Sequence, residues 1–115
     1  MKEQIIQEDK MVEEVLDLSA GRNNKLNESW LAMFGFWTKM ILRKIFGENV
    51  NVPVQIKGSR SEIESFANSL AREKRYMEAI SKYGLNDART YKYRSELDGA
   101  TRKFERDTGL KWPFK

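Results

Sequence analysis

Residues 28–47, ESWLAMFGFWTKMILRKIFG, constrain the fold most, because they gather two tryptophans and three phenylalanines in one stretch. Read as a helix, this stretch places Trp30, Phe34 and Trp37 on one side, and further apolar residues widen the arc well beyond one face. A helix that is apolar around most of its circumference needs burial. We therefore expect a core helix or a subunit contact, with these three aromatic residues as candidate partner contacts.

Residues that favour helix ends set the predicted bounds of this helix. Asn27 or Ser29 can cap its first turn, and Gly47 ends it near residue 46. Aromatic side chains beside Lys39 and Arg43 also fit a helix that lies on a membrane surface, so that alternative stays open. The same basic residues interrupt the apolar run, and we expect no membrane-spanning segment.

The first 28 residues differ in charge from the rest of the chain. They hold four basic and seven acidic side chains, a balance of −3, whereas the remaining 87 residues hold 17 and 10, a balance of +7. Residues 3–18 fit an amphipathic helix, and SAGRNNKLN then indicates a linker. Scattered acidic residues argue against a signal peptide. The sequence predicts an acidic, removable segment over residues 1–28 and a compact, mostly helical domain over residues 29–115.

One short β-strand is predicted at about residues 50–57. Valine and isoleucine alternate there with polar residues or proline, the period of a half-buried strand. Pro53 cannot donate a ladder hydrogen bond, which favours an edge strand. No second strand of comparable quality is evident, so we expect its mate to come from another copy or another protein. Val52 and Val54 are therefore candidate partner contacts.

An antiparallel helical hairpin is predicted after Gly58. In SEIE, Ser61 can cap the first helix and Glu64 can complete a capping box. Gly84 ends that helix, with Leu85 placed for a hydrophobic contact, and NDART begins the next helix, which stops at Gly109. The predicted buried positions are Ile63, Phe66, Leu70, Met77, Ile80, Tyr93, Leu97, Ala100 and Phe104.

The chain then ends in GLKWPFK, which predicts an extended tail laid onto the body, because proline disfavours a helix there. Trp112 and Phe114 are expected to cover the small core. Their insertion into a neighbouring subunit is the alternative, so both residues are candidate partner contacts. The predicted fold is thus mainly α, with one strand.

Catalytic chemistry finds little support in this sequence. The chain has no cysteine and no histidine, which excludes thiolate nucleophiles and Cys or His ligands for zinc. The closest carboxylate pairs, Glu62 with Glu64 and Glu105 with Asp107, are two residues apart on predicted helices and point in different directions. We expect no enzyme, no cofactor and no metal site.

Two basic clusters raise the alternative of a nucleic-acid-binding module. Placed on adjacent helices, they would merge into one phosphate-contacting patch. Interleaved acidic residues favour a solvated ion-pair surface instead. The basic residues concerned are Arg72, Lys74, Arg75, Arg102, Lys103 and Arg106.

The segment KGSRSEIESFANSLAREKRYMEAISKYGLNDARTYKYRSELDGATRKFERDTGLKWPFK, preceded by LNESWLAMFGFWTKMILRKIFG, resembles small head-assembly proteins of T-even-type bacteriophages, the minor prohead core proteins. The similarity covers about residues 26–115. It implies a non-enzymatic part of the inner scaffold that assembles with the capsid shell or with itself. Such a protein would lie in the host cytoplasm during assembly and then in the virion head, without a secretion signal of its own.

The same resemblance implies processing by a prohead protease, which favours cutting after a glutamate that has Ile or Leu two positions before it. Glu8 and Glu28 both fit this pattern, and a cut after Glu28 would release a body that begins at Ser29. A phage regulator that binds a host protein remains a further alternative.

Overall fold

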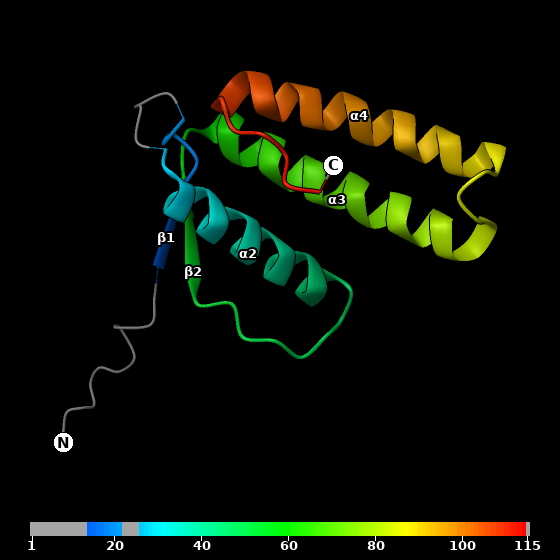
Figure 1. The fold of residues 1–115 in the computed structure, drawn as a ribbon, viewed down its shortest axis with the longest axis horizontal. Coiled ribbons are helices and arrows are strands. Elements are labelled where there is room, and N and C mark those ends of the chain that lie inside the picture. Colours follow the sequence, from blue (N-terminus) through cyan, green and yellow to red (C-terminus); the bar gives the residue numbers. More distant parts are fainter. Residues whose placement is uncertain (1–13, 22–25, 115) are drawn as a thin grey trace.

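The structure, a computed structural model, describes residues 14–21 and 26–114. In chain order the elements are β1 (Glu14–Asp17), α2 (Glu28–Ile45), β2 (Val54–Lys57), α3 (Arg60–Tyr83) and α4 (Ala88–Thr108). Figure 1 shows the two long helices α3 and α4 side by side, with α2 and the two strands gathered at one end of them. The predicted mainly helical character is confirmed, whereas the strand predicted at about residues 50–57 is the shorter β2, which pairs with a strand that was not predicted.

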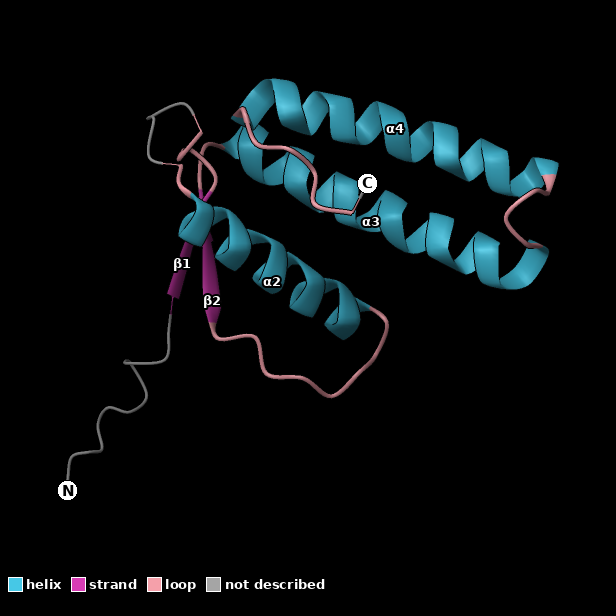
Figure 2. Ribbon diagram, in the orientation of Figure 1, coloured by secondary structure: helices cyan, strands magenta, loops and turns pink. Residues whose placement is uncertain are grey.

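Local signals set the ends of α3 and α4. Gly84 ends α3 with a positive φ of 90°, a conformation that favours glycine. Asp87 then caps α4 by accepting a hydrogen bond from the Arg89 backbone, and Gly109 ends α4 in the left-handed region. Figure 2 shows α4 returning along α3 after a short turn, consistent with the predicted hairpin.

The capping box of α3 lies two residues before the predicted one. Ser59, not Ser61, caps the helix, and Glu62, not Glu64, accepts a hydrogen bond from the backbone N–H of the cap at 2.8 Å. The sequence offers the Ser-x-x-Glu pattern at both registers. The earlier register starts the helix soon after β2 and places the buried Glu62 beside Gly58, where an added Cβ would lie 3.0 Å from the Glu62 carboxylate.

The predicted buried stripe of α3 is wrong at Ile63, near the start of the helix, and at Met77, in its second half, because both side chains are exposed. Leu85, in the turn after α3, is exposed as well. The residues buried against α4 are instead small, such as Ser69 and Ala79, so the two helices pack through short side chains.

The predicted N-terminal helix over residues 3–18 is wrong where the structure describes it. Residues 14–17 form β1, which pairs in parallel with β2 from Glu14 opposite Val54 to Asp17 opposite Lys57. Leu16 and Leu18 are fully buried while Val15 is exposed, the period of a strand. The mate of β2 therefore comes from this chain, not from another molecule. Residues 3–13 of the predicted helix lie outside the described residues.

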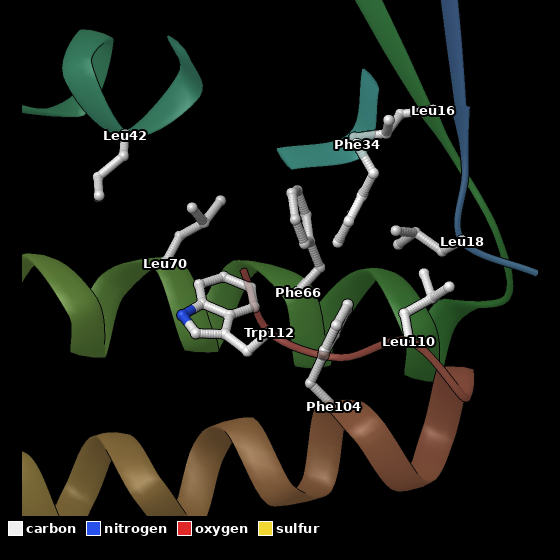
Figure 3. Close-up of a cluster of buried hydrophobic side chains, with 9 residues drawn as sticks. All are labelled: Leu16, Leu18, Phe34, Leu42, Phe66, Leu70, Phe104, Leu110 and Trp112. Carbon is white, nitrogen blue, oxygen red and sulfur yellow. The ribbon is translucent and has the colours of Figure 1, made fainter. Parts of the chain in front are cut away.

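The core forms where α2 and the strands meet the first half of α3 and the last turns of α4 (Figure 3). We call this end of the helix pair the proximal end. Phe34 of α2 stacks on Phe104 of α4 with ring centroids 6.2 Å apart, and Trp112 meets Phe104 edge-on at 5.3 Å. Aromatic pairs in these geometries contribute attraction beyond area burial. The buried cluster comprises Leu16, Leu18, Phe34, Leu42, Phe66, Leu70, Phe104, Leu110 and Trp112.

The tail after α4 turns back across α3 towards α2 (Figure 1). Leu110 and Trp112 are buried in the core, as predicted for a tail laid onto the body. The Trp112 backbone donates to Glu105 at 3.0 Å, and its indole Nε1 donates to Glu73 at 2.8 Å. These contacts hold the tail against both helices of the pair.

Candidate functional site

The candidate partner contacts of α2 occupy different depths. Phe34 is buried in the core, whereas Trp30 and Trp37 are half-buried at its margin. Trp30 stacks on Phe34 at 5.4 Å. The surface available to a partner on α2 is instead supplied by Leu31, Phe36 and Ile45, which sequence reasoning did not single out, with Phe36 53% exposed.

The remaining candidate contacts lie along the strand and the tail. Val52 and Val54 are half-buried, and Val54 packs against the core. Trp112 lies inside the core, and Phe114 is half-buried beside it, with ring centroids 5.7 Å apart. A partner that reached Trp112 would have to open the core, whereas Phe114 is accessible from the surface.

A groove of about 430 Å³ separates the C-terminal half of α2 from the middle of α3. Its walls are largely apolar, and Lys39 and Arg43 stand among its lining residues. Periodicity along α3 had indicated Met77 and Ile80 as buried residues, but not that they face a groove. The apolar lining residues are Leu42, Phe46, Met77, Ile80 and Phe114.

Glu73 lines this groove and is 5% exposed. Burial raises the pKa of its carboxyl, and the hydrogen bond from Trp112 opposes that shift in pKa. The carboxylate is used structurally, because it fixes the indole of the tail. We find no second carboxylate of the described residues hydrogen-bonded to it that would form a catalytic pair.

The six candidate nucleic-acid-binding residues are distributed along α3 and α4 and differ in their ionic contacts. Three of them are held in ion pairs: Arg72 with Glu96 at 3.1 Å, Lys74 with Glu78 at 3.0 Å and Lys103 with Asp107 at 2.7 Å. The hydrogen bonds of Lys103 and Ser65 to Asp107 lower the pKa of Asp107 to about 2.

The other three lie at different levels of the helix pair. Ser69 donates to the Ala100 carbonyl and Thr90 to the Ala79 carbonyl, which fixes the alignment of α3 with α4. Arg75 therefore lies towards the connecting turn, whereas Arg102 and Arg106 lie towards the core.

A cleft of about 240 Å³ lies near the connecting turn, between α3 and α4. Its lining consists of two basic residues, two tyrosines, one acidic residue and one alanine: Arg75, Lys82, Tyr83, Tyr93, Glu78 and Ala79. Sequence reasoning found Arg75 but missed both tyrosines. Basic and aromatic residues recur together over residues 74–94, a signal that could have indicated this site.

The candidate processing site lies at the start of α2. Glu28 and Ser29 are both exposed and belong to the first helical turn. Asn27 caps that turn by accepting a hydrogen bond from the Trp30 backbone at 2.8 Å. Glu8, the other candidate, lies outside the described residues.

Within residues 14–21 and 26–114, no three His, Cys, Asp or Glu residues gather as metal ligands would. None of the helices in this part of the chain combines the length and apolar character needed to cross a membrane. Comparison with protein-family models, curated proteins and solved structures gave no match to this chain.

Proposed function

We propose that this protein is a non-enzymatic component of a bacteriophage head, in the inner scaffold or associated with the capsid, and that it acts by packing against other proteins. The observation that carries the proposal is the apolar surface left open on α2 and beside it. Phe36 on α2 is more than half exposed, and the groove between α2 and α3 is apolar. Exposed apolar side chains beside an apolar groove are typical of interaction sites. The phage assignment itself rests on the resemblance of residues 26–115 to prohead core proteins.

The absence of reactive residue types supports a role without catalysis. The chain has neither cysteine nor histidine. Its buried carboxylates are used in structure: Glu62 completes the capping box of α3, and Glu73 holds the tail. The proposed partners are head or scaffold proteins and further copies of this chain, in the host cytoplasm and then in the virion head.

Processing after Glu28 would have a defined structural effect. The bond lies in the exposed first turn of α2, so a protease reaches it by unwinding one helical end. The cut would separate β1 covalently from the body, although Leu16 and Leu18 belong to the core. The removed segment would then be retained only by its contacts with β2 and the core, unless processing precedes folding.

The intact mass of the chain in its native source tests this proposal. We expect a particle-bound product that begins at Ser29, or full-length protein bound to particles if the cut does not occur. Full-length protein found only in the soluble fraction, in a one-to-one complex, would overturn the head assignment and favour a regulator that binds a host protein.

A matched pair of variants tests the surface that carries the proposal. Phe36→Ser removes an exposed apolar side chain from α2, and Leu85→Ser removes one of similar exposure, 56%, from the turn between α3 and α4. We expect Phe36→Ser to lower the particle-bound fraction several-fold and Leu85→Ser to leave it unchanged. Equal incorporation of both variants, each folded by circular dichroism, would exclude the α2 surface.

A further inference from the structure

All four tyrosines of the chain and its entire net charge lie within residues 74–94, which we call the hairpin tip. The tip holds six basic and two acidic side chains, a balance of +4. The other residues hold 15 basic and 15 acidic ones, so the chain outside the tip is neutral overall. Positive charge and aromatic rings are therefore concentrated together at one end of the helix pair.

Both acidic residues of the tip are already paired. Lys74 contacts Glu78 at 3.0 Å, and Arg89 contacts Asp87 at 3.0 Å. Hydrogen bonds from Arg89 lower the pKa of Asp87 to about 2. Four basic side chains of the tip have no ion pair to a carboxylate of the described residues: Arg75, Lys82, Lys92 and Arg94.

Two of these cations line the cleft between α3 and α4. Arg75 and Lys82 are exposed and lie seven residues apart on one side of α3, a separation of about 10 Å along the helix axis. Tyr83 and Tyr93 are half-buried and form the aromatic part of the lining. The Lys82 Nζ lies 5.4 Å from the centroid of the Tyr83 ring. Two cations thus flank aromatic surface in one concave site, and the one carboxylate in its lining, Glu78, is paired with Lys74.

We propose that this cleft at the hairpin tip binds single-stranded nucleic acid. Arg75 and Lys82 contact successive parts of the phosphate backbone, and an unstacked base packs on the aromatic lining, principally on Tyr93. Grooves that combine basic residues with stacking rings bind single strands without sequence preference. A duplex presents its bases already stacked, so it would use the cations alone. An acidic peptide would likewise leave the tyrosines unused.

This site is independent of the proposed packing surface, which lies on α2 and in the groove beside it. The lining residues of the cleft come only from α3 and α4. Failure of the nucleic-acid site would therefore leave the packing proposal standing, and the reverse also holds.

Fluorescence anisotropy with the full chain and a labelled 15-nucleotide oligothymidine tests the proposal at about 50 mM salt and upwards. We expect Arg75→Ala/Lys82→Ala to weaken binding at least tenfold and to reduce the slope of log affinity against log salt by about 1.4, since each single-strand phosphate contact contributes about 0.7. The matched control, Arg102→Ala/Arg106→Ala, makes the same change in charge away from the tip and should alter affinity less than threefold. An equal loss of affinity in both double variants would overturn the site, because it would mean that overall positive charge alone attracts the oligonucleotide.

Ring substitutions test the stacking part of the proposal. Tyr93→Leu should weaken binding by about 5- to 150-fold, because loss of one stacked base is worth about 1–3 kcal/mol, whereas Tyr93→Phe should retain it. A duplex of the same length should bind at least tenfold more weakly than the single strand. Equal binding of the duplex, or displacement of the oligonucleotide by polyglutamate at equal charge concentration, would overturn the assignment to single-stranded nucleic acid.

Discussion

The two ends of the α3–α4 pair differ sharply in what they bury. At the proximal end, Phe66 and Phe104 pack with Trp112 and with Phe34 of α2. At the hairpin tip the buried residues are small, Ala79 and Thr90, and the large rings stay partly exposed among cations. The same two helices therefore carry stability at one end and surface chemistry at the other. A side chain's position along the pair, more than its type, decides which of the two it serves.

Phe104→Ala, at the proximal end, should lower the free energy of unfolding more than any other variant proposed for this pair of helices. Phe104 is fully buried and contacts three aromatic rings, so its truncation leaves a cavity at the centre of the core. We expect the free energy of unfolding to fall by about 3–5 kcal/mol in urea denaturation. Tyr91→Ala at the exposed tip is the control and should cost under about 1 kcal/mol. Similar losses in both variants would remove the distinction between the two ends.

Gly21→Ala tests the contact between the turn after β1 and the end of α4. A Cβ at residue 21 would clash with the backbone oxygen of Thr108 and lie 3.1 Å from the Gly109 carbonyl carbon. Backbone cannot move aside as a flexible side chain can, so we expect a loss of about 1–3 kcal/mol in thermal or urea unfolding.

Gly99→Ala is the matched control for Gly21→Ala. Gly99 lies within α4 and has open space where its Cβ would be. Alanine is a better helix former than glycine, and we expect a gain of about 0.5–1 kcal/mol in the same assay. A loss at Gly99, or no loss at Gly21, would show that the proximal packing differs from that described.

Glu73→Gln separates charge from hydrogen bonding at the edge of the core. Because the pKa of Glu73 is raised in the folded state, its favourable contribution is complete below its unfolded pKa, near 4.5, and is lost as pH rises through the folded pKa. Glutamine keeps an acceptor for the Trp112 indole but does not ionise. At pH 7 the variant should be as stable as the natural chain or more so, by under about 1 kcal/mol.

The pH dependence of unfolding, followed by urea titration from pH 4 to pH 8, checks this prediction. The difference between the variant and the natural chain should shrink as pH falls. A variant that is less stable at pH 7 and equal at pH 4 would mean that the ionised carboxylate stabilises the fold.

Arg75→Ala/Lys82→Ala should have the smallest effect on stability. Both side chains are exposed and make no ion pair with the described residues, so the free energy of unfolding should change by less than about 0.5 kcal/mol. The same variant should lose oligonucleotide binding. A loss of stability above about 1 kcal/mol would show that the tip also supports the fold.

Much of the helical part was predictable from the sequence, because its signals are local. Gly84, Asp87 and Gly109 set the ends of α3 and α4 through contacts within a few residues. The capping box was less certain, since Ser59 and Ser61 each begin the same pattern. Only the junction with β2 and the burial of Glu62 decide between them.

The strand β1 was not predictable in the same way. Its four residues gain their pairing from β2, and the spacing of Val12, Val15 and Leu16 also suits a helical stripe. The pairing of β1 with β2 decides between a strand and a helix here. The cleft at the hairpin tip also depends on tertiary structure, because Tyr83 and Tyr93 line one site only when α4 folds back on α3.

The parallel pairing of β1 with β2 also has a consequence for the order of folding. Glu14 pairs with Val54, so 40 residues must be closed into a loop before the first strand contact forms. The contacts of α3 with α4 span much shorter separations near their turn and form sooner. During synthesis β1 is made before α3 and α4, and we expect it to dock after they have paired. Leu16→Ala should therefore speed unfolding and leave the refolding rate almost unchanged in stopped-flow measurements, whereas slower refolding would place β1 in the nucleus.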